Sequence, residues 1–281
     1  MLSILYGIAS AFTWGAGDFA GGLASRKLGA YRAVMYADLF GLILVGIAFS
    51  IHREAIPALS VLINSAIGGI LGSVGLLILY YSLTQGQMSI AAPVSALFAA
   101  VLPVVVGTLT EGLPKPVQFI GFAIALTAVW LISSGNQTER FQLNHLADLR
   151  LPILAGFGFG SYFIFIHYAT QETDTILWPM IASRMSGTLL LFIVVLFRRE
   201  SFVVQRDAWG VVLLNATLDL LGNFFYILAT RAGRLDIAAV LSSLYPGSTV
   251  LLAWFFLKER IALRQWVGIA AALLAIVLFT L

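Results

Sequence analysis

Residues 55–110 read AIPALSVLINSAIGGILGSVGLLILYYSLTQGQMSIAAPVSALFAAVLPVVVGTLT and contain no Asp, Glu, Lys or Arg. One transmembrane helix uses about 20 residues, so an uncharged block of this length predicts more than one crossing of a bilayer. The polar break TQGQMS at residues 84–89 separates the two crossings. This stretch therefore indicates an integral membrane protein.

The composition of the whole chain agrees with this prediction. Hydrophobic residues make up 60% and charged residues 10% of the 281 residues, which is too little charge to cover a soluble globule. Apolar runs divided by charged or Gly/Pro-rich turns predict ten spans and no soluble domain. The expected spans are 2–24, 31–51, 62–84, 89–110, 116–135, 151–171, 175–197, 208–230, 236–257 and 263–281.

The chain divides into two similar halves. The polar stretch NQTERFQLNHLADLR, residues 136–150, is the expected linker between a first repeat, 1–135, and a second repeat, 151–281. Gly75, Gly86, Ile90-Ala91-Ala92, Ser95 and Leu97 recur 147 residues later as Gly222, Gly233, Ile237-Ala238-Ala239, Ser242 and Leu244. A repeat of five spans is an odd number, so its two copies are expected to have inverted topology.

Several functional classes are disfavoured by residue usage. The first apolar run lacks the features of a cleaved signal and is expected to be a retained helix. With no cysteine and only three histidines, the chain offers no thiol chemistry and no multi-histidine metal site, so no metal and no cofactor is expected. The net charge of +3 comes from short loops beside spans, so nucleic acid is not an expected partner.

Over essentially the whole chain, the sequence resembles the EamA-type members of the drug/metabolite transporter superfamily. The resemblance lies in the two five-span repeats, in WGAGDF at residues 14–19, and in SSLYPGSTVLLAWFFLKERIALRQWVG at residues 242–268. It implies an all-α, basket-like bundle that moves small metabolites by alternating access, without covalent chemistry. It does not name the substrate, because the superfamily carries amino acids, amines, sugars and nucleotide sugars.

Asp18 is the charged residue of the first span. A carboxylate at mid-span costs roughly 2.5–3.5 kcal/mol on insertion scales, so it is expected to face the bundle interior or a wet cavity. Small and polar residues share its helical face at three- and four-residue steps: Ser3, Gly7, Ser10, Trp14, Gly21 and Ser25. Close helix packing accounts for the glycines and serines, whereas Asp18 is a candidate for substrate binding or proton coupling.

Two further charges occupy equivalent places in the repeats. Asp38 and Arg184 each precede a glycine, Gly41 or Gly187, by three residues and lie 184 − 38 = 146 positions apart. One interpretation is a buried ion pair, the usual way to tolerate such charges. The alternative is that Arg184 grips a substrate carboxylate, and the pair could also open and close during transport.

The span 208–230 supplies Asp219 and Asn223 on one helical face. Asp18, Asp38 and Asp219 outnumber Arg184 by two charges at mid-span. One of the acids is therefore a candidate to carry a coupled proton, and a cationic ligand is the alternative.

Aromatic residues and a histidine complete the predicted cavity lining. Trp14, Tyr81 and Tyr245 are candidates to stack on an aromatic ligand or to enclose an amine, although membrane anchoring is also typical of Trp and Tyr. His167 shares a helical face with Gly156 and Gly160, and could bond a carbonyl at the helix end or shuttle protons.

Proline positions suggest where helices bend. Pro93 and Pro103 lie in the fourth span, 89–110, and Pro246 lies in the ninth, 236–257. Each is expected to kink or locally open its helix, and gating is the functional alternative.

The orientation of the chain is left open by two conflicting criteria. Odd-numbered loops hold eleven Lys and Arg residues and even-numbered loops hold four, which puts both termini outside by the positive-inside rule. The family resemblance implies that both termini are cytoplasmic. An even number of spans predicts that both ends share one side, in the plasma membrane of a bacterium or archaeon.

These observations favour a secondary transporter, acting as a monomeric exporter of a small polar metabolite such as an amino acid or amine. Membrane lipid surrounds it, and protons are the candidate coupling ion. A channel or uncoupled facilitator is the main alternative. A membrane-embedded lipid-modifying enzyme is a further one, but the chain contains none of the Ser-nucleophile, zinc or phosphate-loop motifs searched for, so no catalytic residue is assigned.

Overall fold

The computed structural model describes residues 1–84, 88–133, 149–258 and 260–281, with side chains described except at 80–84, 88–93 and 133. Helices account for 85% of the chain and the described residues form no strand, which confirms the all-helical prediction. The linker prediction falls largely outside the described residues. The side chains of Tyr81 and Pro93 also lie outside them.

Nine of the ten predicted spans fall on one helix each. These helices are α1 (Leu2–Leu28), α2 (Ala30–Ile51), α3 (Leu59–Thr84), α4 (Met88–Thr110), α5 (Pro116–Ser133), α6 (Arg150–Gln171), α7 (Leu177–Phe197), α8 (Trp209–Arg231) and α11 (Leu263–Thr280). A 3-10 turn, η2 (Arg206–Ala208), precedes α8. The predicted span 236–257 falls on two helices, α9 (Leu235–Ser242) and α10 (Tyr245–Leu257).

The break between α9 and α10 has a local cause. Pro246 has no N–H and cannot continue the hydrogen-bond ladder of the preceding helix. The chain turns tightly there, and the Leu244 N–H donates to the Leu241 carbonyl at 3.1 Å. The helix is thus interrupted next to Pro246, whereas α4 continues through Pro103 to its end at Thr110.

Seven of the described helical segments are long and apolar enough to cross a membrane, judged by length and composition. α1 is 27 residues long but is not one of the seven, and it carries the small and polar face around Asp18. Large apolar side chains point outward, including Phe12 at 58% and Leu189 at 60% exposure, as a lipid-facing surface requires. The protein is therefore a multi-pass membrane protein, and the count of ten crossings stays a prediction.

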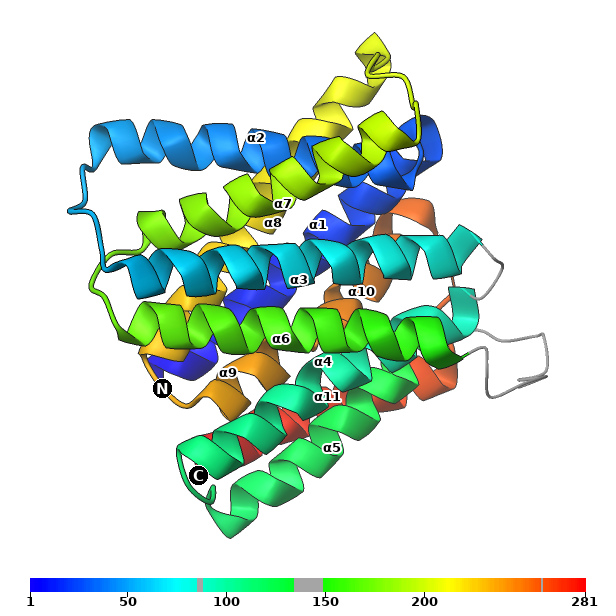
Figure 1. Ribbon diagram of the computed structural model, residues 1–281. Helices are drawn as coiled ribbons and strands as arrows, with labels where there is room; N and C mark the ends of the chain where they lie inside the picture. The colour runs from blue at the N-terminus through cyan, green and yellow to red at the C-terminus, as the bar shows by residue number, and fades with distance from the viewer. Residues whose placement is uncertain (85–87, 134–148, 259) are drawn as a thin grey trace.

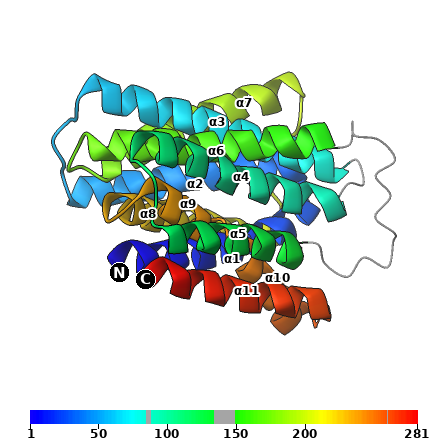
Figure 2. The same cartoon turned by 90° about the horizontal axis from the view of Figure 1, so that it is seen from below.

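Helices of the two halves of the chain pack against each other throughout the bundle (Figure 1). α1 packs on α8 and α3 packs on α6, while α2 contacts α7, α4 contacts α9, and α5 contacts α11. When the spans are numbered one to five in each half, exchanging the halves maps this set of contacts onto itself. Figure 2 shows both termini side by side at one end of the bundle.

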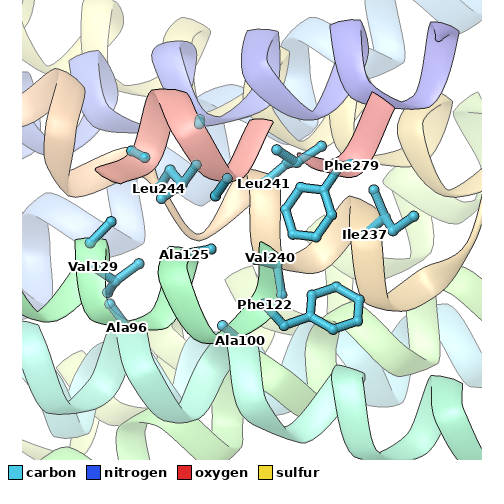
Figure 3. Close-up of a cluster of buried hydrophobic side chains, with 14 of the residues drawn as sticks. Ala96, Ala100, Phe122, Ala125, Val129, Ile237, Val240, Leu241, Leu244 and Phe279 are labelled. Carbon is cyan, nitrogen blue, oxygen red and sulfur yellow. The ribbon is translucent and has the colours of Figure 1, made fainter. Parts of the chain in front are cut away.

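One buried apolar cluster fastens α4, α5, α9 and α11 together (Figure 3). Alanines such as Ala100 and Ala125 allow these helices to approach closely. The rings of Phe122 and Phe279 lie 5.1 Å apart between centroids and fill the space at one end of the cluster. Tyr245 at the start of α10 packs against this cluster and also lines the polar cavity described below.

Candidate functional site

Arg184 of α7 bridges two carboxylates from different helices. Its guanidinium donates one hydrogen bond to Asp38 of α2 and another to Asp219 of α8. The side chains of Arg184 and Asp38 are 8% and 12% exposed, whereas that of Asp219 is 33% exposed. The ion pair expected between Asp38 and Arg184 is present, and Asp219 makes it a triad.

Small residues make room for this triad. Ser73 of α3 donates its hydroxyl to Asp38 at 3.2 Å. A Cβ added at Gly187 would lie 2.5 Å from the Ser73 hydroxyl and 2.9 Å from the Asp38 carboxylate. Any side chain larger than hydrogen at this position of α7 would therefore displace the acid from its partners.

One sequence offset relates two pairs of residues in this network. Asp38 and Arg184 differ by 184 − 38 = 146 positions, and Ser73 and Asp219 differ by 219 − 73 = 146. Each half thus supplies one residue from its second helix and one from its third. Within each half the two residues bond to each other, and Asp38 and Arg184 join the halves.

Asp18 of α1 lies beside this network without joining it. Its side chain is exposed, lines the same cavity, and experiences the negative charge of Asp219. Among the described residues no hydrogen bond or ion pair to Asp18 is found. Asp18 is thus an available acceptor at the centre of the bundle, in contrast to Asp38.

Aromatic rings form the wall next to Asp18. The Trp14 indole stacks on Phe163 at 5.5 Å and on Tyr226 at 5.8 Å between ring centroids. A Cβ added at Gly222 would collide with this indole, so the glycine lets Trp14 lie flat against α8. The aromatic stack therefore fixes the orientation of one cavity wall.

A second polar pair, Tyr162 and Asn223, lies beside the triad. Tyr162 of α6 donates its hydroxyl to the Asn223 side-chain oxygen. The Asn223 amide nitrogen donates to the backbone carbonyl of Asp219 at 2.6 Å, one turn earlier in α8. These bonds leave Asn223 with a fixed amide orientation.

These groups surround a cavity of about 140 Å³ in the middle of the bundle, which we call the central cavity. Its lining comes from both halves, with residues of α1, α2, α3 and α4 facing residues of α6, α7, α8 and α10. Asp18 and Asp219 lie on the α1–α8 side, and Leu76 and Leu79 lie on α3. The cavity is therefore acidic on one side and apolar on another.

Most residues singled out from the sequence meet at this cavity. The structure places there Trp14, Asp18, Asp38, Arg184, Asp219, Asn223 and Tyr245. Pro246 follows Tyr245 at the start of α10, and Pro103 is buried within α4 away from the lining. Tyr81 and Pro93 have side chains outside the described residues.

His167 was predicted to line the cavity, but it is not among the lining residues of the central cavity. Its Nε2 donates to Glu111 Oε1 at 2.9 Å, where α4 ends next to α6. Glu111 also accepts the backbone N–H of Leu235 at the start of α9, 3.2 Å from each carboxylate oxygen. Burial acts to raise the pKa of Glu111, but the bonds from His167 and Leu235 outweigh it and hold this pKa below its ordinary value.

Sequence reasoning missed Ser73 as a cavity residue, and it did not select Tyr162 from the aromatic residues of the spans. Ser73 could have been found from its offset of 146 residues to Asp219, the same offset that identified Asp38 and Arg184. Tyr162 follows the glycines of α6 that allow close packing on α3, including Gly158, whose added Cβ would lie 2.8 Å from the Gly75 Cα. A neutral tyrosine has no large free-energy cost of insertion into a membrane, so nothing in the sequence distinguishes it as a cavity residue.

A multi-pass helical bundle with a buried polar cavity shared by both halves is the architecture of a membrane transporter. The family model described as the EamA-like transporter family matches residues 1–134 and 149–281. The chain belongs to this family, within the drug/metabolite transporter superfamily, which confirms the resemblance noted in the sequence.

Individual proteins show the same likeness. An uncharacterized transporter of Archaeoglobus fulgidus is 23% identical over 298 aligned residues, covering 100% of this chain and 99% of its own. An uncharacterized protein of Methanocaldococcus jannaschii is 26% identical over 133 residues, covering 47% of this chain and 94% of its own. A protein of known crystal structure has the same fold, with a TM-score of 0.82 and 15% identity over 99% of this chain and 96% of its own.

Proposed function

We propose that the chain is a secondary transporter that moves a small polar metabolite, an amino acid or an amine, by alternating access through the central cavity. The observation that carries this proposal is Asp18, an ionisable side chain without a partner among the described residues, exposed in a cavity lined by both halves. Ionisable groups inside membranes are costly and are usually retained for substrate or proton pathways.

The proposed architecture is ten spans in two inverted five-span repeats, residues 1–135 and 151–281. Three observations support it. The five helix contacts named above map onto themselves when the halves are exchanged, and the family model matches one stretch on each side of residues 135–148. The M. jannaschii protein, which aligns over 94% of its length with 47% of this chain, has the extent expected of one copy. Transporters built this way bind substrate near the midplane between repeats.

Asp18 is proposed to bind the substrate or a coupled proton, and Asp219 shares this role. Asp38 and Arg184 form an ion pair between the two proposed repeats. This ion pair must break or shift when α2 and α7 separate. We propose export, with protons as coupling ion and no covalent chemistry. The plasma membrane of a bacterium or archaeon is the proposed location, and the monomer is the proposed working unit.

Counterflow tests the proposal most simply. Purified protein is reconstituted in liposomes loaded with a mixed metabolite panel, and the exchange of labelled compounds is measured for wild type and Asp18→Asn. We expect saturable exchange of at least one compound in wild type and its loss in the variant. Asp207→Asn is the matched control, because Asp207 is an exposed acid bonded to Lys27 and does not line the cavity.

Other outcomes separate the alternatives. Flux that does not saturate and shows no exchange indicates a channel. Chemical conversion of a labelled lipid indicates an enzyme. Unchanged exchange by a folded Asp18→Asn/Asp219→Asn double variant contradicts the site assignment, and assays in vesicles of known orientation decide the direction.

A further inference from the structure

The charged groups of the central cavity do not balance. Three carboxylates, those of Asp18, Asp38 and Asp219, line it. Arg184 is the one cationic side chain in its described lining. With all four groups ionised, the cavity carries two excess negative charges.

Arg184 is not available to a ligand in this state. Two of its guanidinium nitrogens donate to Asp38 and Asp219, and its side chain is only 8% exposed. A substrate carboxylate could reach the guanidinium only by displacing one of these acids. It would also approach Asp18 and Asp219, and the repulsion between like charges is strong where water is scarce.

An ammonium group meets the opposite situation. Asp18 accepts no hydrogen bond among the described residues, and the carboxylate of Asp219 is one-third exposed. A cation between these two acids would offset their mutual repulsion and would gain charge-assisted hydrogen bonds. The Trp14 ring beside Asp18 adds an aromatic surface of the kind that favours cations.

Part of the remaining cavity lining is apolar. Leu76 and Leu79 of α3 and Phe159 of α6 line it and offer no hydrogen-bond donor or acceptor in their side chains. α3 and α6 pack on each other, and the hydroxyls that they bring to the lining, those of Ser73 and Tyr162, are already bonded to Asp38 and Asn223. A ligand that contacts both the two acids and these apolar side chains must therefore have a cationic head and an apolar body.

We propose that the central cavity takes a small amine that lacks a carboxylate, with its ammonium group between Asp18 and Asp219 and its apolar body against Leu76, Leu79 and Phe159. This inference rests on the proposed function and narrows its substrate class from amino acids and amines to amines. The volume of about 140 Å³ sets the size, because a cavity of about 150 Å³ holds a benzene-sized molecule.

Matched probes test the inference on the purified wild-type protein in detergent. Three probes share one aromatic body. Phenethylammonium carries only an ammonium group, 3-phenylpropionate carries only a carboxylate, and phenylalanine carries both. Binding of each is measured by isothermal titration calorimetry at neutral pH. We expect phenethylammonium to bind about tenfold or more tightly than phenylalanine, and 3-phenylpropionate to show no binding. Equal or tighter binding of phenylalanine or 3-phenylpropionate overturns the inference, as does the absence of phenethylammonium binding.

Variants add a second line of evidence. Asp18→Asn should reduce phenethylammonium affinity about tenfold or more, while Asp207→Asn should leave it unchanged, and unchanged affinity in Asp18→Asn overturns the inference. If Asp18→Asn does not fold, the selectivity of the wild-type protein among the three probes still tests the inference. Counterflow in liposomes keeps the two proposals apart: saturable exchange of zwitterions or anions but not amines overturns only the substrate class, whereas no saturable exchange of any compound overturns the proposed function.

Discussion

Asp38 and Arg184 meet across the contact between α2 and α7 as a buried ion pair, although 184 − 38 = 146 positions separate them in the chain. α2 belongs to the first half of the chain and α7 to the second, so the pair lies where the two halves are in contact. Asp219 shares the same guanidinium from the neighbouring helix α8. Any motion that separates α2 from α7 therefore breaks the bond between Asp38 and Arg184.

Loss of Arg184 should be costly to folding. In Arg184→Ala, Asp38 keeps its bond to Ser73 but has no cation nearby, and breaking a buried pair in this way typically costs about 3–5 kcal/mol. We expect a large drop in the thermal unfolding temperature of the detergent-solubilised protein. Asp219→Asn should cost less, because the Asp219 side chain is 33% exposed and Arg184 keeps Asp38. Equal stability of Arg184→Ala and wild type would show that the triad contributes little to folding.

Two glycines of α1 should respond differently to the same substitution. A Cβ at Gly15 would collide with the Tyr245 carbonyl of α10, whereas a Cβ at Gly22 meets nothing within 4 Å. Gly15→Ala should therefore force α1 and α10 apart and cost about 1–3 kcal/mol. Gly22→Ala should be neutral or stabilising by up to about 1 kcal/mol, because alanine favours helix. Thermal unfolding of the two variants side by side gives the comparison, and the opposite order would contradict the close approach of α1 and α10.

Glu111 should make stability depend on pH in the acid range. Its pKa in the folded protein lies below the ordinary value of 4.5, since hydrogen bonds from His167 and the Leu235 N–H outweigh burial. The stabilisation that the Glu111 carboxylate gives to the folded protein is fully present above pH 4.5. It is lost as the pH falls through the lower pKa of the folded state. Glu111→Gln should therefore lower the unfolding temperature at neutral pH, and the difference from wild type should narrow below 4.5.

Unfolding temperatures of wild type and Glu111→Gln across this pH range provide the measurement. Asp207→Asn serves as the control, because Asp207 is exposed and its bond to Lys27 lies on the surface, where salt bridges contribute little. A constant difference between wild type and Glu111→Gln at all pH values would contradict the role given to the carboxylate charge.

Much of the fold could be predicted because lipid imposes strict rules on sequence. An uncharged block such as residues 55–110 indicates helices inside a membrane, and the cost of charge there identified Asp18, Asp38, Arg184 and Asp219 as candidates. The break between α9 and α10 was predictable from Pro246 for the same kind of reason, since proline removes a donor from the ladder.

The rest required three-dimensional contacts. The bond from Tyr162 to Asn223 joins α6 to α8, and hydroxyl and amide groups leave no pattern in a sequence that says which helices they join. The position of His167 depends on Glu111 lying at the end of α4 beside α6, which periodicity within one helix cannot reveal. Asp219 bonds to Arg184 because α7 and α8 both pack on α2, which sequence periodicity does not show.

Accessibility of the central cavity from the two sides of the membrane tests the central claim most directly. The chain has no cysteine, so Leu76→Cys places a single thiol in the cavity without background. Vesicles of known orientation are treated on one side or the other with a membrane-impermeant thiol reagent, with and without an exchanging substrate. The account predicts labelling from either side and slower labelling when substrate occupies the cavity. A thiol that reacts from neither side while transport continues, or whose labelling substrate does not slow, would contradict an alternating-access site at this cavity.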